Sequence, residues 1–327
     1  MSAGISDAFS AYAQSSRPKV VPVSKTSVPM TKPAEPPALV PPTPGTVNYV
    51  AKRGDSIPSV ARQFLKQTSY LHSVQLADAI RKANGDRRGT LLKSGESIII
   101  PGILSSPIVE KPVPVARDFE VRAIYLTGVM AGSEHGDRIV RRWRELGGNS
   151  VVFDIKDSDG IVNIAFDHPL AGGAHHPYIS DLPKYTHFLH SQGMHAIARV
   201  AIFRDEHLVT THPELAVKSR RTGQSWRENG KLVWTDTSQA KVQDYDIALA
   251  RKAIEGGADE VQFDYVRFPA EGDQKDASFV YQTEHPEWHR SDVIVSFLKK
   301  AYAEIHPTGA LLSLDVFGVM ALSLIHI

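Results

Sequence analysis

Three aspartates stand at the ends of runs of strand-forming residues: Asp154, Asp264 and Asp315. Each run is rich in β-branched and aromatic residues and follows a segment of helical or polar character. In a barrel of parallel strands, the side chains at the carboxyl ends of the strands meet at one rim, where such enzymes do their chemistry. Carboxyl groups that meet there can serve as general acid, base or nucleophile. The sequence therefore predicts a carboxylate-based catalytic site made by these three aspartates.

The most informative run is Gly257–Pro269, which reads GADEVQFDYVRFP. It follows a helix-like segment and stops at a proline, which cannot continue a ladder of hydrogen bonds. Because side chains alternate along a strand, Glu260, Gln262 and Asp264 are expected on one face and the apolar residues between them on the other. Burying Gln262 and Asp264 gains nothing unless a polar centre lies on their side. We expect that centre to be the axis of a barrel.

Strands and helices are predicted to alternate along residues 118–327. The predicted strands are 121–127, 149–156, 194–202, 257–264 and 311–316, and the predicted helices are 137–145, 182–192, 240–255 and 293–305. This order implies an α/β fold with parallel strands and right-handed crossovers. The acids at strand ends and the long loop 203–237 favour a (β/α)8 TIM barrel over a doubly wound sheet.

A complete barrel of this kind needs about 250 residues. Residues 118–327 are fewer than that, so we expect a barrel that is truncated after about five strands. The run 321–327 has no helical pattern, which also indicates a fragment. The barrel region is expected to be C-terminally incomplete.

The chain before the barrel divides into three parts. Residues 1–46 are rich in proline and predict a disordered tether, with a PxxP ligand as the alternative. Residues 47–102 predict a compact α+β unit with strand, helix, helix, strand (βααβ) order, and residues 103–117 a linker. The first residues lack the basic and apolar regions of an export signal. No apolar run reaches the roughly 20 residues of a membrane-spanning helix.

The compact unit resembles a LysM module. The resemblance lies in Tyr49-Val50, in Gly54-Asp55-Ser56, in a central Asn84, and in Leu92, Gly95 and Ile98-Ile99-Ile100-Pro101. LysM modules bind glycans that contain N-acetylglucosamine, such as peptidoglycan, which implies a partner polysaccharide and a location in the cell envelope or outside the cell. The residues that the resemblance places near the glycan are Gly54, Asp55, Ser56, Ile57, Asn84 and Gly85. The alternative is purely structural, because Asp55 and Ser56 also suit a helix cap.

The barrel region resembles the bacterial putative glycosyl hydrolase domain family, which comprises TIM-barrel proteins allied to the α-amylase-like glycosidases. The resemblance lies in the strings at 152–157, 197–200, 261–269 and 314–318. By position it implies that Asp264 is the nucleophile. The allied enzymes have an arginine two residues before the nucleophile, where this chain has Gln262, and a glutamate as general acid, where the nearest acid here is Asp315.

The expected mechanism is glycoside hydrolysis by two carboxyl groups that flank the scissile bond. Asp264 is predicted to act as nucleophile or base and Asp315 as the acid, with Asp154 and Arg199 binding sugar or orienting Asp264. The further predicted substrate-binding residues are Gln262, Tyr265, Arg267, Trp226 and Trp234. Tyr265 and Arg267 are expected to keep Asp264 ionised, and the tryptophans to stack on sugar rings. Each also has a structural alternative, such as a rim ion pair, a loop cap or simple packing.

The composition bears on which other classes of function the chain could have. A formal charge of +1 gives no electrostatic case for nucleic acid, and the absence of cysteine excludes disulfides and thiolate-bound metal. No cofactor and no metal are predicted, and the oligomeric state stays unknown. One alternative is a metal-dependent hydrolase such as a deacetylase, using residues among His168, His175, His176, His207, Asp154 and Asp205. The other alternative is a wall-binding protein whose barrel has no catalytic activity.

Overall fold

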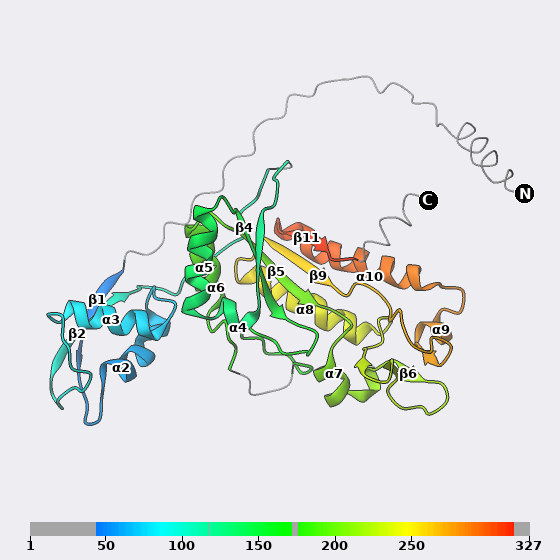
Figure 1. Ribbon diagram of the computed structural model, residues 1–327, viewed down its shortest axis with the longest axis horizontal. Helices are drawn as coiled ribbons and strands as arrows, with labels where there is room; N and C mark the ends of the chain where they lie inside the picture. The colour runs from blue at the N-terminus through cyan, green and yellow to red at the C-terminus, as the bar shows by residue number, and fades with distance from the viewer. Residues whose placement is uncertain (1–43, 117, 172–175, 317–327) are drawn as a thin grey trace, which may run out of the picture. The chain divides into compact units, whose positions relative to one another are not determined.

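The computed structural model describes residues 44–116, 118–171 and 176–316 (Figure 1). The predicted tether 1–46 lies almost wholly outside the described residues, as do His175 and the run 321–327. Within the described residues, no helix is both long enough and apolar enough to cross a membrane.

The first described unit has the predicted strand, helix, helix, strand order. Its elements are β1 (Gly45–Val50), α2 (Ile57–Phe64), the short 3-10 turn η1 (Leu65–Gln67), α3 (Ser73–Ala83) and β2 (Ser97–Ile103). The two strands pair antiparallel. The helices bury one apolar face each, with Val60 of α2 and Leu76 of α3 in a core separate from that of the rest of the chain.

A five-stranded parallel sheet forms the centre of the remaining chain (Figure 1). Its strands are β3 (Ala123–Leu126), β4 (Ser150–Lys156), β5 (His195–Ala201), β9 (Glu260–Asp264) and β11 (Leu311–Leu314). Each strand pairs with the next of these along the chain, so the spatial order is β3, β4, β5, β9, β11. This sequential order is that of a barrel wall, because a doubly wound sheet reverses its order at a switch point. The expected α/β class with parallel strands is confirmed.

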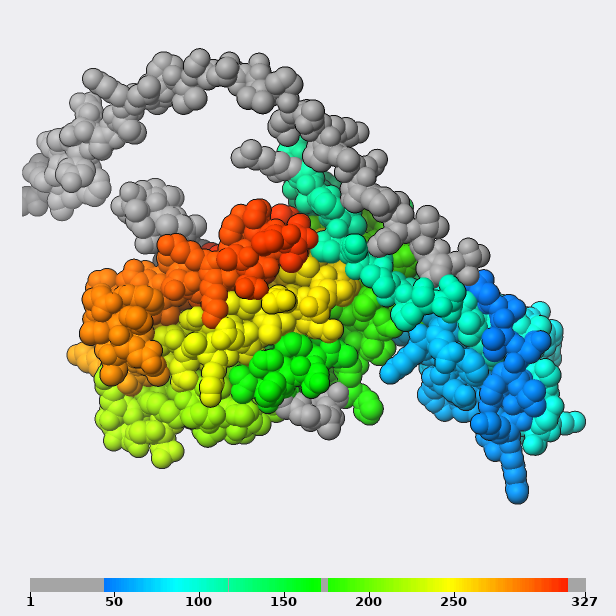
Figure 2. All heavy atoms as spheres, turned by 180° about the vertical axis from the view of Figure 1, so that it is seen from behind, coloured from blue at the N-terminus to red at the C-terminus, as the bar shows by residue number. Residues whose placement is uncertain are grey.

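Four main helices connect these strands: α5 (Glu134–Glu145), α6 (Leu182–Ser191), α8 (Ala240–Glu255) and α10 (Arg290–Ile305). Helices α8 and α10 lie side by side on the surface seen in Figure 2. The smaller elements are α4 (Gly128–Ala131), α7 (Glu206–Thr211), η2 (Pro213–Leu215), β6 (Lys218–Ser219), β7 (Arg227–Glu228), β8 (Leu232–Val233), β10 (Ala277–Ser278), α9 (Tyr281–Glu284) and η3 (His306–Thr308). Most of these lie in the long loops that follow β5 and β9.

The two faces of the sheet differ in polarity. One face carries the apolar set, in which Phe153 of β4 packs edge-on against Tyr185 of α6 and Phe263 of β9 packs against Phe297 of α10. These side chains are almost completely buried. Because alternate residues point the other way, Asp154 and Asp264 project from the opposite face, away from these helices. The alternation predicted for 260–264 is therefore confirmed.

Several predicted boundaries move by a few residues. Helix α5 begins at Glu134, earlier than expected, because the Ser133 hydroxyl caps it by accepting a hydrogen bond from the Gly136 N–H at 3.1 Å. Strand β9 begins only at Glu260, because Gly257 has a φ of +92°, a left-handed conformation that no strand adopts.

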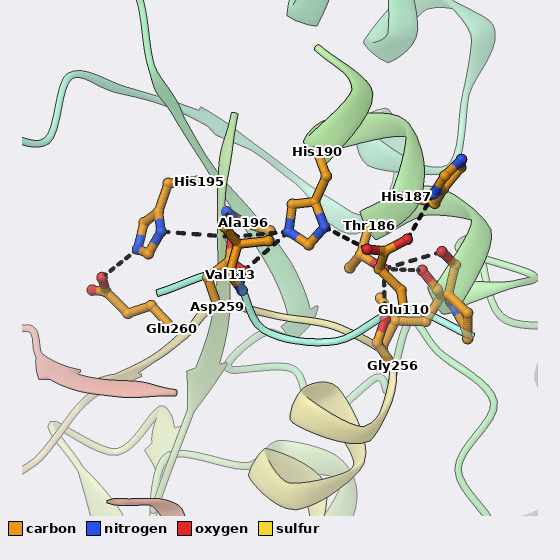
Figure 3. A network of polar contacts seen from close by, with 12 residues as sticks. Glu110, Val113, Thr186, His187, His190, His195, Ala196, Gly256, Asp259 and Glu260 are labelled. Atoms are coloured by element: carbon orange, nitrogen blue, oxygen red, sulfur yellow. Dashed lines mark hydrogen bonds and ion pairs between the residues drawn. The ribbon is translucent and has the colours of Figure 1, made fainter. Parts of the chain in front are cut away.

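The linker is fixed to the sheet by acids and histidines (Figure 3). Glu110 contacts His187 (2.7 Å) and His190 (2.9 Å) on α6, and His190 in turn contacts Asp259 at 3.0 Å. Asp259 also accepts a hydrogen bond from the Val113 N–H at 2.6 Å. Burial opposes the charges of Glu110 and His190, but their mutual interactions outweigh it, lowering the pKa of Glu110 to about 2 and raising that of His190 to about 9. The linker is thus held by ion pairs at neutral pH.

Candidate active site

Arg199 of β5 joins two of the three predicted aspartates. Its Nε donates a hydrogen bond to Oδ2 of Asp264 at 3.0 Å, and its Nη2 donates to the same oxygen. Its Nη1 donates to Oδ1 of Asp154. Burial works against the charge on Arg199, but the hydrogen bonds and negative charges of both aspartates outweigh it and raise the pKa of the guanidinium. Arg199 therefore stays positively charged and holds the two carboxylates in register across three adjacent strands.

The carboxylate of Asp154 is buried, and both of its oxygens accept hydrogen bonds. Its second oxygen accepts a hydrogen bond from the Tyr125 hydroxyl of β3, opposite the guanidinium of Arg199. Burial raises the pKa of Asp154, and the hydrogen bonds from Tyr125 and Arg199 oppose that rise. The same burial and hydrogen bond raise the pKa of Tyr125, so its phenol keeps its proton. Asp154 was expected to bind sugar or to orient Asp264. Its burial favours the second role, which it performs through Arg199.

Asp264 keeps a partly exposed carboxylate at the end of β9. Its side chain is 20% exposed, against 2% for that of Asp154. The Tyr265 N–H donates to its Oδ1 at 2.6 Å, so both oxygens are fixed. Tyr265 has a φ of +60°, a left-handed conformation that is uncommon outside glycine. Backbone strain of this kind concentrates where a functional geometry must be held.

Asp315 lies beside Asp264 on the neighbouring strand. The Asp315 N–H donates to the Phe263 carbonyl at 2.8 Å, which extends the parallel pairing of β11 with β9 by one step. Burial and then the negative charge of Asp264 raise the pKa of Asp315, while Arg199 opposes this. Asp264 thus forms an ion pair with Arg199, whereas the pKa of Asp315 is raised. Two carboxyl groups whose environments differ in this way can divide the roles of base and acid.

Tyr265 contacts Asp264 through its backbone N–H, and Arg199 supplies a charged partner. Arg199 binds Asp264 directly. The Arg267 guanidinium lies over the Trp234 ring, 4.6 Å from its centroid, and 5.8 Å from the ring centroid of Tyr265. Arg199 takes this role because β5 pairs directly with β9, so that residues on the same face of the two strands are neighbours.

The predicted stacking of Trp226 and Trp234 on sugar is not supported. Trp226 is 4% exposed and Trp234 is completely buried, with its indole Nε1 donating to Glu228 at 2.9 Å. Both rings belong to the large hydrophobic core that packs on the sheet, so neither offers a free face. Gln262 lies on the same face as Asp264, paired in register with Arg199 on one side and Ser313 on the other, and is half-buried.

The described histidines among those proposed as metal ligands do not gather into a metal site. His168 stacks on Phe166 and tilts against Tyr245. In the ranges that the structure covers, no three histidine or acidic side chains gather as metal ligands. Asp205 instead pairs with the buried Lys156 at 2.8 Å. His168 and Asp205 thus make contacts that stabilise the fold.

The residues assigned to glycan binding in the first unit all have structural explanations. Asp55 accepts hydrogen bonds from the Tyr49 hydroxyl and the Lys52 N–H, both at 2.7 Å. Ser56 caps α2, and Asn84 bonds both polar backbone groups of Ile99 at 2.9 Å. Gly54 and Gly85 adopt positive φ angles in turns. Ile57 is 1% exposed and belongs to the core, so its predicted contact with glycan is not supported.

Two residues of this region were not predicted from the sequence: Tyr125, which bonds Asp154, and Arg204, which bonds the Tyr265 hydroxyl at 2.8 Å. The alternation of β3 offered a signal for Tyr125, because it places Tyr125 on the face that carries Asp154. Arg204 follows β5 in an irregular turn, where no periodic pattern applies.

Residues 123–324 match the family described as "Putative glycosyl hydrolase domain". The match begins at β3 and does not include the first unit. It contains Asp154, Arg199, Asp264 and Asp315. No curated protein sequence matches the chain.

The solved structures that resemble the chain include a bacterial hypothetical protein and two glycosidases. A hypothetical protein from Ruminiclostridium thermocellum is 35% identical, with a TM-score of 0.52, over 60% of this chain and 99% of that one. A chitobiase from Flavobacterium johnsoniae is 12% identical, with a TM-score of 0.42, over 68% of this chain and 34% of that one. A GH36 α-galactosidase from Geobacillus stearothermophilus is 15% identical, with a TM-score of 0.42, over 70% and 34% respectively. The chain therefore spans about a third of the length of these two enzymes.

Proposed function

This chain belongs to the family of putative glycosyl hydrolase domains, and from that premise we propose that it hydrolyses glycosidic bonds with Asp264 and Asp315. The observation that carries the proposal is the position of these two residues at the ends of adjacent strands, with Arg199 bound to Asp264. We also propose that the five parallel strands are part of a (β/α)8 barrel, whose active sites lie at this end of the strands.

Asp315 acts as the general acid in this mechanism. Its raised pKa lets it carry a proton at higher pH than an ordinary aspartate, and it gives that proton to the glycosidic oxygen as the bond to the sugar breaks. Asp264, charged in its ion pair with Arg199, faces the positive charge that develops at the sugar. Asp264 either attacks the anomeric carbon or removes a proton from the attacking water. Both routes use the same pair of residues.

Arg199, Asp154 and Tyr125 hold Asp264 in place. Asp154 accepts a hydrogen bond from Nη1 of Arg199, and the Tyr125 hydroxyl in turn donates to Asp154. The guanidinium of Arg199 is therefore held on the side away from Asp264 as well. The supporting contacts make Asp154 a positioning residue. Rigid support of this kind is what a reacting carboxylate needs, because small displacements cost much of the rate.

The first unit is proposed to bind a glycan containing N-acetylglucosamine and so to hold the enzyme near a wall or extracellular polysaccharide. Support comes from its strand, helix, helix, strand order and from the LysM-like residues named above. Pull-down of the whole chain on insoluble peptidoglycan tests this part. A chain that stays in the supernatant contradicts it, whatever the hydrolysis assay gives.

The hydrolase proposal is tested by the release of reducing sugar from wall and exopolysaccharide fragments. Asp264→Asn removes the charge without changing the size of the side chain, and we expect it to abolish release. Asp244→Asn on the outer side of α8 is the matched control, because the Asp244 side chain is 59% exposed and pairs with Lys300 on the surface. Equal activity of wild type and Asp264→Asn would contradict the proposal.

A further inference from the structure

The residue that follows Asp264 has a strained backbone. Tyr265 has a φ of +60°, a left-handed conformation that costs free energy in a residue with a side chain. In this conformation its N–H donates to Oδ1 of Asp264 at 2.6 Å. Such a conformation persists only where the surrounding contacts enforce it. The contacts of Tyr265 therefore decide where one oxygen of the proposed catalytic carboxylate lies.

The side chain of Tyr265 is held at two points by the loop that follows β5. The rings of Tyr265 and Trp234 make a T-shaped contact, with centroids 6.0 Å apart and an interplanar angle of 74°. The Tyr265 hydroxyl accepts a hydrogen bond from Nη1 of Arg204 at 2.8 Å. The loop is also closed on itself, because the N–H and the hydroxyl of Thr235 both donate to the Phe203 carbonyl at 2.8 Å. Arg204 and Trp234 thus belong to one folded segment, which contacts both the ring and the hydroxyl of Tyr265.

Trp234 is itself fixed by a buried carboxylate. The indole is completely buried, and its Nε1 donates to Oε2 of Glu228 at 2.9 Å. The other oxygen of Glu228 accepts hydrogen bonds from the N–H groups of Ala270 and Glu271, at 2.9 and 2.7 Å. Both of these residues lie a short way along the chain after Tyr265. Glu228 therefore links Trp234 to the segment that carries the strained turn.

Packing alone does not account for this arrangement. A buried carboxylate has lost its hydration, so an apolar pair of the same volume would fill this part of the core at lower cost. What Glu228 and Trp234 add is direction, because a hydrogen bond to Nε1 fixes the rotation of the indole ring. That rotation sets which part of the indole meets the ring of Tyr265.

We propose that Trp234, oriented by Glu228, is a positioning residue for Asp264. Trp234 holds the ring of Tyr265, and the ring holds the left-handed turn that directs the Tyr265 N–H at Oδ1 of Asp264. Arg199 fixes Oδ2 of the same carboxylate at 3.0 Å. The inference rests on the proposed glycosidase function, because it gives Trp234 an effect on turnover without any contact with sugar.

Kinetics on the glycan fragment that the wild type cleaves test the effect on turnover. We expect kcat of Trp234→Phe to fall about 10-fold or more while KM stays within about 2-fold, because a small displacement of a reacting group costs rate rather than binding. Glu228→Gln should give the same pattern, since one of its acceptor oxygens becomes an NH2 donor. Trp143→Phe on α5 is the matched control, because it also loses an indole hydrogen bond, to the Ser150 carbonyl at 3.2 Å. A kcat of Trp234→Phe no lower than that of Trp143→Phe overturns the inference.

An NMR measurement tests the position of the turn without any cleavage. The whole chain is labelled with ¹⁵N-tyrosine, and the Tyr265 amide is the resonance that is missing from Tyr265→Phe. A hydrogen bond to a charged carboxylate moves an amide proton downfield, so we expect this resonance downfield in the wild type and in Trp143→Phe, and shifted upfield in Trp234→Phe and Glu228→Gln. An unchanged Tyr265 resonance in both of the latter variants overturns the inference. A wild type that releases no sugar contradicts the hydrolase proposal, and the resonance then still decides whether Trp234 holds the turn.

Discussion

Removing the guanidinium of Arg199 should destabilise the protein and reveal its ion-pair network. In Arg199→Met, the side chain keeps its length but Asp154 and Asp264 lose their shared cation. Asp154 is buried, so its charge would have neither solvent nor a cation to offset it. Breaking a buried ion pair by removing one partner costs about 3–5 kcal/mol. For a folded region of this size, that corresponds to a fall in unfolding temperature of roughly 6–20 °C.

The assay is thermal and urea unfolding followed by tryptophan fluorescence. A second substitution makes the test more specific. Asp154→Asn in the Arg199→Met background removes the buried, unpaired charge and should recover a large part of the lost free energy of unfolding. The same Asp154→Asn alone should destabilise, because it leaves Arg199 with one carboxylate. A loss below about 1 kcal/mol in Arg199→Met, the size of a surface pair, would refute the reasoning. Strict additivity of the two substitutions would also refute it, because residues in one network must be coupled.

Three further predictions concern other sites. If Asp315 is the general acid, the rate of hydrolysis should fall as pH rises through its raised pKa, because the acid must carry a proton. In Asp315→Asn the pH-rate profile should lose this alkaline limb, and an unchanged limb would assign the limb to another group. The pKa of His190 is raised to about 9, so the stabilisation that His190 gives the linker is complete below its ordinary pKa near 6.5 and is lost as pH rises through 9. The stabilisation that Glu110 gives is complete above about pH 4.5 and is lost as pH falls through about 2. Hydrogen exchange of the linker amides should therefore rise at both extremes, and a flat profile would contradict the ion-pair account. Gly257→Ala should destabilise by about 1–2 kcal/mol or more, because φ is +92° and a Cβ would lie 2.6 Å from that of Glu110; an unchanged urea midpoint would show that this turn relaxes freely.

The parts of the fold that rest on periodicity were predictable from the sequence. The alternation in 260–264 gave the correct face for Asp264, and helix 240–255 was predicted at its observed bounds. Both signals come from apolar residues that recur with the period of the element. Boundaries were less predictable because they depend on capping, as at Ser133, or on a left-handed glycine, as at Gly257.

The partners within the site were harder to predict. That one guanidinium, Arg199, binds both Asp154 and Asp264 follows from the pairing of β5 with β4 and with β9, which no local pattern encodes. The burial of Trp234 depends likewise on how the loop after β5 folds over its own core. Tertiary contacts fix the conformation of long irregular loops. The sequence therefore shows that the loop contains tryptophans, but it does not show which of their ring faces are exposed.

The division of roles between the two carboxyl groups is tested most directly by changing the leaving group. On the sugar that the wild type cleaves, a dinitrophenyl glycoside has a leaving group that needs no proton. The account predicts that Asp315→Asn keeps most of its activity on the dinitrophenyl glycoside and loses it on the natural glycan, whereas Asp264→Asn loses both. Equal losses on the two substrates in Asp315→Asn, or activity of Asp264→Asn on either, would contradict the assignment of acid and nucleophile or base.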